Sequence, residues 1–183
     1  LEPKVAGKIM QIKNFMIATE PLEESRATAL INGRFGVHDT RFVVNYFRLS
    51  DDNRLIFGGG ENYRAGFPSD IKNFVRPHML KLFPQLRDVG IDYGWGGTLS
   101  VTVNRLPHVG RLPPNGFFAQ GYSGHGVVPT HLMGEIMSDA IGGTMERYDL
   151  FAGMKHFRLP GSQWFGNQII ALGMMYYKML DRL

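Results

Sequence analysis

Glycine clusters constrain the fold of this chain more than any other sequence feature. They lie at residues 58–60, 94–97, 121–126 and 142–143. Glycine makes up 23 of the 183 residues, well above the usual share of about 7%. Because glycine has no side chain, a cluster lets the backbone approach a neighbour closely. The sequence therefore predicts several segments whose backbone lies against other parts of the protein or against a ligand.

Two strand-like runs on either side of a turn predict a β-hairpin. Residues 41–49 and 54–57 are rich in aromatic and β-branched side chains, and the turn-forming residues 50–53 separate them. We expect the second strand to end at the glycines 58–60. Further strands are expected at 9–19 and, interrupted by glycine, at 91–103.

Three helices are expected. Apolar residues recur at helical spacing over 71–83 after the capping residues Ser69 and Asp70, and Pro77 should kink or divide that helix. The second helix covers about 127–141 and the last about 167–183. Residues 105–114 read as a proline-rich connection.

A different pattern precedes the second helix. Residues 117–120 suit a short buried strand, and they lead through a glycine-rich turn into residue 127. Strand, glycine turn and helix are typical of a parallel β-α unit, whereas hairpins build antiparallel sheets. We therefore expect an α+β fold, an antiparallel sheet with flanking helices plus an incomplete α/β layer.

Composition narrows the functional classes. The 20 Lys and Arg exceed the 16 Asp and Glu by only four and are scattered, which argues against a nucleic-acid partner. The absence of cysteine excludes disulfides and thiolate metal sites, and the six histidines show no metal-binding spacing. The longest apolar run, 169–180, is interrupted by polar residues, so we expect no membrane span and a cytoplasmic protein.

The turn at 121–126, GYSGHG, carries the clearest chemical signal. Free N–H groups at the start of a helix favour an anion or an electron-rich ring oxygen. The alternative is a tight turn that needs glycine for a positive φ. A serine nucleophile elbow fails because His125 stands where that motif has glycine.

Two other glycine-rich segments leave alternatives open. Residues 58–60 either line a flat ring or form a bulge at a strand end. Trp95, set among glycines, is either a wall against a planar ligand or a core tryptophan.

Taken together, these segments resemble the FAD-dependent amine and amino-acid oxidase superfamily, which includes glycine, sarcosine and D-amino-acid oxidases. The matching stretches follow the family order along the chain: IATEPL at 17–22, NYFRLSDDNRLIFGGG at 45–60, FPQL at 83–86, IDYGWGG at 91–97, RLPHVGRL at 105–112, GYSGHGV at 121–127, RYDLFA at 147–152 and LPG at 159–161.

The resemblance covers only the carboxyl-terminal part of such an enzyme. The strand and G-x-G-x-x-G turn that hold the ADP half of FAD have no counterpart here, and residue 1 is Leu. The resemblance implies a substrate-binding domain at 1–103, the last strand and helix of an incomplete Rossmann-like FAD domain at 104–146, and a carboxyl-terminal tail and helix at 147–183. We expect the missing amino-terminal half to be a partner in FAD binding.

The resemblance also implies functional residues. The expected cofactor contacts are Gly58, Gly59, Gly121, Tyr122, Ser123, Gly124, His125, Gly126 and Val127. The expected catalytic and substrate-pocket residues are Tyr46, Tyr63 and Trp95, whose rings suit an ammonium group. No metal is expected.

The implied activity is oxidation of an amine by hydride transfer to flavin, with oxygen as acceptor. The substrate would be gamma-glutamylputrescine-like or polyamine-like, or an amino acid. Without cysteine the FAD would be noncovalent, and Val127 and Val128 stand where sarcosine oxidases carry a lysine, which favours an amine without an α-carboxylate. The alternative is a catalytically silent folding or interaction module that forms homo-oligomers or needs its missing half.

Overall fold

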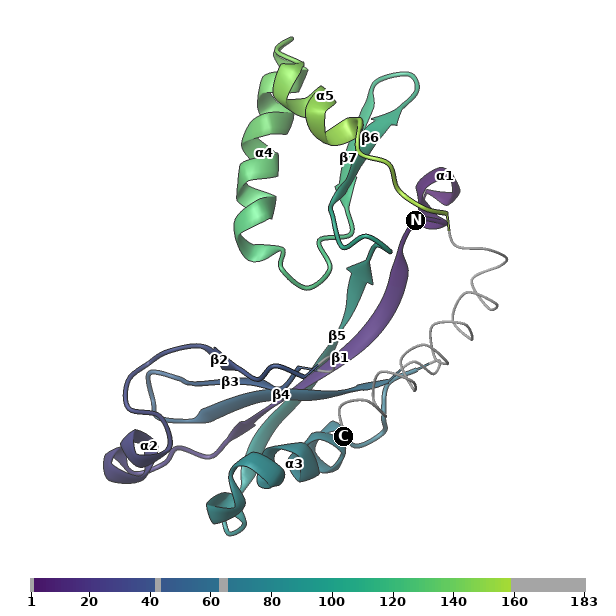
Figure 1. The fold of residues 1–183 in the computed structure, drawn as a ribbon. Coiled ribbons are helices and arrows are strands. Elements are labelled where there is room, and N and C mark those ends of the chain that lie inside the picture. The colour runs from purple at the N-terminus through teal and green to yellow at the C-terminus, as the bar shows by residue number, and fades with distance from the viewer. Residues whose placement is uncertain (1, 42–43, 63–65, 159–183) are drawn as a thin grey trace. The chain divides into compact units, whose positions relative to one another are not determined.

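The chain forms two compact units (Figure 1). In this computed structural model, residues 2–41, 44–62 and 66–158 are described. Unit 1 comprises Leu1–Ile12 and Leu99–Ile169, and unit 2 comprises Lys13–Thr98 and Ile170–Leu183. The expected division by role into 1–103, 104–146 and 147–183 stays a prediction.

Unit 2 is built on a sheet with the strand order β2-β3-β4-β1-β5. The strands are β1 (Met10–Thr19), β2 (Val37–His38), β3 (Tyr46–Leu49), β4 (Leu55–Asn62) and β5 (Ile91–Val101). The β3–β4 pair is antiparallel and confirms the expected hairpin. However, the expectation that the second strand ends at the glycines was wrong, because β4 continues through them to Asn62.

Two helices cover one face of this sheet. They are α2 (Glu24–Leu30) and α3 (Ile71–Leu82), and α3 lies along the sheet in Figure 1. Asp70 caps α3 by accepting a hydrogen bond from the Asn73 N–H at 3.0 Å. The helix is not divided at Pro77, because Val75 and Met79 on either side of the proline are both anchored in the core. The main core residues are Phe15, Ile17, Leu55, Phe57, Val75, Met79 and Leu86.

Unit 1 contains a second hairpin that the sequence analysis missed. Strands β6 (His108–Leu112) and β7 (Gly116–Gln120) pair antiparallel. Residues 105–114 are therefore not simply a connection, because the prolines at 107, 113 and 114 fall outside the paired stretch. The strand expected at 117–120 exists, but it is half-buried along its length rather than buried.

Helices pack against this hairpin (Figure 1). They are α4 (Val127–Ile141) and α5 (Glu146–Ala152), and a short helix α1 (Pro3–Ala6) lies near the amino terminus. The α4 bounds confirm the expected helix. A second, separate core forms from Val109, Met133, Ile136, Ala140 and Tyr148. The helix expected at 167–183 lies outside the described residues.

Candidate functional site

The turn at 121–127 joins β7 to α4 and has a strongly curved backbone. Gly121, Ser123 and Gly124 have φ angles of +73°, +55° and +88°. Gly121 needs to be glycine for a second reason, because a Cβ atom there would lie 2.5 Å from Thr102 Cγ2. The tight turn with positive φ, which was one of the two interpretations of this segment, is present, and it includes one residue with a side chain.

Ser123 holds the turn in place. Its side chain is buried, and its backbone N–H donates to the Ser100 carbonyl at 3.1 Å. The Ser123 hydroxyl donates to the Gly121 carbonyl at 3.1 Å and accepts from the Thr102 N–H at 3.3 Å. These hydrogen bonds fix the backbone of the turn and occupy the Ser123 hydroxyl. An engaged hydroxyl agrees with the sequence, which does not match the serine nucleophile motif.

The first turn of α4 presents uncapped backbone. Its N-cap is Gly126, and within the described part of the chain no side chain accepts a bond from this end. The N–H groups of Val127 and Val128 have no intrahelical acceptor, and the two side chains are 81% and 76% exposed. The positive end of the helix dipole therefore faces outward, where it suits a negatively charged or electron-rich group.

In unit 2, Tyr46 and Gly58 lie directly opposite each other on β3 and β4. A Cβ atom at position 58 would lie 2.2 Å from the Tyr46 ring. The Tyr46 hydroxyl hydrogen-bonds the Asn14 side chain. A Cβ atom at Gly59 would meet Asn45 Oδ1 at 2.6 Å. These glycines make room for the protein's own side chains, and a contact of Gly58 or Gly59 with a cofactor stays a prediction.

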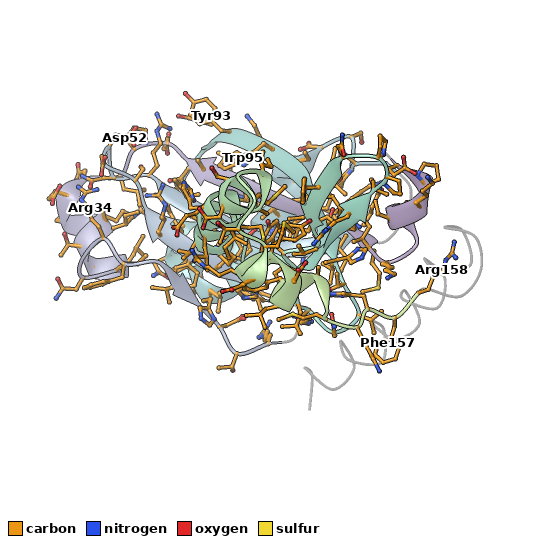
Figure 2. All side chains as sticks on the ribbon, turned by 90° about the horizontal axis from the view of Figure 1, so that it is seen from above. Arg34, Asp52, Tyr93, Trp95, Phe157 and Arg158 are labelled. Carbon is orange, nitrogen blue, oxygen red and sulfur yellow. The ribbon has the colours of Figure 1, made fainter. Side chains whose placement is uncertain are left out.

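Trp95 is a surface residue of β5 and not a core tryptophan. It is 42% exposed, and Tyr93, two residues earlier, is 57% exposed. Figure 2 shows Tyr93 extending outward from the ribbon. The neighbouring Gly96 faces the core, since a Cβ atom there would lie 2.9 Å from the Phe15 ring. By strand alternation Trp95 points to the opposite face of the sheet.

The expected site residues divide between the two units. The residues of the 121–127 turn belong to unit 1, whereas Tyr46, Gly58, Gly59 and Trp95 belong to unit 2. Tyr63 lies outside the described residues. Tyr46 and Gly58 are in contact, as the hairpin register requires.

Arg54 braces strands rather than standing free for a ligand. It pairs with Asp52 at 2.7 Å and Asp92 at 2.5 Å, and it donates to the Thr19 carbonyl at 2.8 Å. Its guanidinium also lies 5.2 Å from the centre of the Tyr93 ring. The pKa of Arg54 is raised, first by the hydrogen bond to Asp92 and then by that to Asp52.

A pocket of about 280 Å³ in unit 2 was not anticipated. No local motif signals it, because its walls come from strands far apart in the sequence. Its lining includes Met16, Val37, His38, Tyr46, Arg48 and Ile56.

Two features are absent from the part of the chain that the structure describes. No group of three or more His, Cys, Asp or Glu side chains could hold a metal ion there. In the same residues, no helix has the length and apolarity needed to cross a bilayer.

Comparison with known proteins defines the class. The family model described as FAD dependent oxidoreductase matches residues 1–140. The chain belongs to this FAD-dependent oxidoreductase family.

Individual relatives agree with that assignment. Over all 183 residues the chain is 42% identical to gamma-glutamylputrescine oxidoreductase of Escherichia coli (strain K12), of which it covers 43%. It is also 42% identical over 175 residues to the probable oxidoreductase OrdL of Haemophilus influenzae, covering 96% of this chain and 40% of that protein. The chain thus spans less than half the length of these curated relatives.

Solved structures share the fold. Glycine oxidase from Geobacillus kaustophilus matches with a TM-score of 0.61 at 18% identity, covering 84% of this chain and 41% of that one. The L-proline dehydrogenase of P. horikoshii matches with a TM-score of 0.57 at 23% identity, covering 76% and 37%. The α+β fold with an antiparallel sheet is therefore confirmed, while the Rossmann-like role of the β7–α4 segment stays a prediction.

Proposed function

We propose that the protein to which this chain belongs oxidises an amine with FAD as cofactor, and that this chain supplies the substrate-binding part and one edge of the flavin site. The observation that carries the proposal is the uncapped start of α4, held by the buried Ser123. Family membership supports FAD as the group that this helix end meets.

The residues of the turn fit such a group. Gly124 and Gly126 carry no side chain that would block approach to the α4 N–H groups, and a Cβ atom at Gly124 would have only one described heavy atom within 4 Å, at 3.9 Å. These N–H groups would stabilise negative charge on the ring. Bound FAD would supply the hydride acceptor for the amine and a path for the electrons to oxygen.

Unit 2 would hold the substrate. The exposed Trp95 and the half-buried Tyr46 offer aromatic faces to an ammonium group, and Tyr63 is a third candidate from the sequence. The relative named gamma-glutamylputrescine oxidoreductase supports an amine of that type or another polyamine-like amine. We assign the rest of the FAD site to the part of the longer protein outside this chain. We also propose that the protein is located in the cytoplasm.

A charge placed at the start of α4 tests this proposal. Val127→Asp puts a carboxylate where the anionic part of the cofactor would lie, so FAD retention should fall several-fold and the flavin reduction potential should become more negative. Ile141→Asp makes the same charge change at the other, exposed end of α4 and should leave both unchanged. The readout is the visible flavin spectrum of the longer protein after free FAD is removed.

Equal FAD retention and equal potential in the two variants would show that α4 does not meet the flavin. The chain alone should be measured alongside, with FAD added. If neither the chain nor the longer protein retains flavin, the alternative of a silent folding or interaction module gains support, and size-exclusion over a range of concentrations would then detect its oligomers.

A further inference from the structure

The pocket in unit 2 lies on the face of the sheet opposite the core. His38 stands opposite Tyr46, Tyr46 opposite Gly58, and Gly58 opposite Met16. This row crosses four strands. The residues on either side of Met16, Phe15 and Ile17, are fully buried beneath the helices. Alternation therefore places the row on the other face of the sheet.

The pocket combines an apolar floor with one cation. Met16 and Ile56 contribute aliphatic surface, and Arg48 stands opposite Ile56 in the β3–β4 register. A pocket of about 280 Å³ is near the lower end of the size range for small-molecule sites. Its chemistry suits a ligand that has an aliphatic chain and a negatively charged end.

Arg48 is available for such an end. Its guanidinium donates a long hydrogen bond from Nη1 to the Leu49 carbonyl at 3.3 Å. Among the described residues, no carboxylate forms an ion pair with Arg48, whereas Arg26 pairs with one carboxylate and Arg54 and Arg147 pair with two each.

Asp39, next to the pocket residue His38, is already engaged. Asp39 accepts hydrogen bonds from the Asn45 backbone and side-chain N–H groups at 3.0 and 2.6 Å, and it pairs with Arg41 at 3.7 Å. The neighbouring His38 donates through Nδ1 to the Asp39 carbonyl at 2.9 Å, which orients its ring. Asp39 therefore does not compete for Arg48.

We propose that this pocket binds the acidic end of the substrate, with Arg48 pairing with a carboxylate that an aliphatic chain separates from the reacting amine. The inference rests on the proposed function, and it adds a specificity-determining residue to it. A guanidinium matches a carboxylate through two parallel hydrogen bonds, which an uncharged chain end cannot form. The aliphatic part would pack on Met16 and Ile56.

The test compares two probes that differ only in the carboxylate, 5-aminopentanoate and pentylamine. Binding to the full 183-residue chain is followed through the methyl NMR signal of Met16, which Met16→Leu identifies among the ten methionines. The wild-type chain should bind 5-aminopentanoate about ten-fold more tightly than pentylamine. Arg48→Ala should abolish this preference, and Arg48→Lys should restore part of it.

Arg87→Ala is the matched control, because Arg87 is an exposed arginine of the same unit outside the pocket. It should leave the preference intact. The proposal is overturned if Arg48→Ala keeps the preference, if Arg87→Ala removes it equally, or if neither probe shifts the Met16 signal. The measurement needs neither FAD nor turnover, so its outcome is independent of whether the protein oxidises amines.

Discussion

At the scale of single residues, Tyr46 occupies the space that a side chain at position 58 would need. The ring is half-buried, and its hydroxyl is held by Asn14 on β1. The Tyr46–Asn14 hydrogen bond thus links the three neighbouring strands β3, β4 and β1 on the pocket face. A side chain added at position 58 would have to displace the Tyr46 ring.

Gly58→Ala should therefore lower the free energy of unfolding by about 1–3 kcal/mol, because the Tyr46 ring must rotate away from Asn14. In a Tyr46→Ala background the same substitution should cost much less, since the clash is gone. Urea denaturation of the four members of this cycle measures the coupling.

Gly97→Ala on β5 is the control, because among the described atoms none lies within 4 Å of a Cβ placed there. Gly97→Ala should lower the free energy of unfolding only slightly, both in the wild-type chain and in the Tyr46→Ala background. Additive effects of Gly58→Ala and Tyr46→Ala would contradict the contact.

Residue identity predicted some of these features and missed others. A tight turn with positive φ was one of two interpretations of residues 121–126, and Gly121 and Gly124 adopt such angles. The occupant of the space at Gly58 was not identified, because it depends on which residue of β3 pairs with it. Arg48 carried no signal in the sequence, since an arginine that lacks a carboxylate partner within the described ranges is recognised only once its surroundings are known.

At the scale of elements, the β6–β7 hairpin buries a histidine. His108 pairs with Gln120 across the hairpin, and its Nδ1 accepts from Gln120 Nε2 at 3.0 Å. Its ring lies 4.8 Å from that of His156. Burial lowers the pKa of His108 to about 4, and the charges of Lys8 and His156 act in the same direction. Burial also lowers the pKa of His156.

This shift makes the free energy of unfolding depend on pH. Between pH 6.5 and about 4 the unfolded chain binds a proton at His108 while the folded chain does not, so stability falls as the pH drops through this window. At ~1.4 kcal/mol for each pKa unit, the full loss is on the order of 3 kcal/mol. Urea denaturation at pH 7 and pH 5 should show about half of this loss.

His108→Gln should flatten this dependence, although His156 retains part of it. His131→Gln, which alters an exposed histidine on α4, should leave the slope as in the wild type. Identical slopes for wild type and His108→Gln would exclude His108 as its source.

Local sequence patterns were sufficient to predict some of the helices and strands. The turn at 50–53 lies between runs of apolar residues and predicted the β3–β4 hairpin, and the helix expected at about 127–141 is α4. The β6 strand was missed because prolines flank it on both sides, and proline is a strong signal of irregular structure. Pro77 was expected to kink or divide the helix, but α3 continues through it as one helix. Packing of α3 against the sheet outweighs the one hydrogen bond that the proline removes.

At the scale of the whole chain, two hydrophobic cores form separately. One contains Met79 beneath the sheet of unit 2, and the other contains Ile136 on α4 in unit 1. The local pattern of apolar residues predicted which elements are amphipathic. It did not predict how they divide between cores, because that depends on contacts between segments far apart in the sequence. The pocket was missed for the same reason, since its row of residues crosses four strands.

Each core should respond to its own truncation. Met79→Ala should lower the stability of unit 2 by about 2–5 kcal/mol, and Ile136→Ala should do the same for unit 1. Trp164→Phe removes the other tryptophan, so that the fluorescence of Trp95 reports on the unfolding of unit 2. Hydrogen exchange of the α4 amides reports on the unfolding of unit 1.

We expect Met79→Ala to shift mainly the Trp95 transition and Ile136→Ala mainly the α4 exchange. Both side chains are almost fully buried, so the two substitutions are matched in kind. If either substitution shifted both readouts equally, the cores would behave as one cooperative unit.

The hydrogen bonds of Ser123 also have a kinetic consequence. They set the backbone of the turn before α4 during folding, so a molecule arriving at this helix end meets donors already in position. The conformational entropy of this turn is therefore lost when the chain folds and not when a ligand binds. Capture at α4 should therefore proceed in a single step, at a rate that rises linearly with ligand concentration and shows no plateau from a slow loop rearrangement.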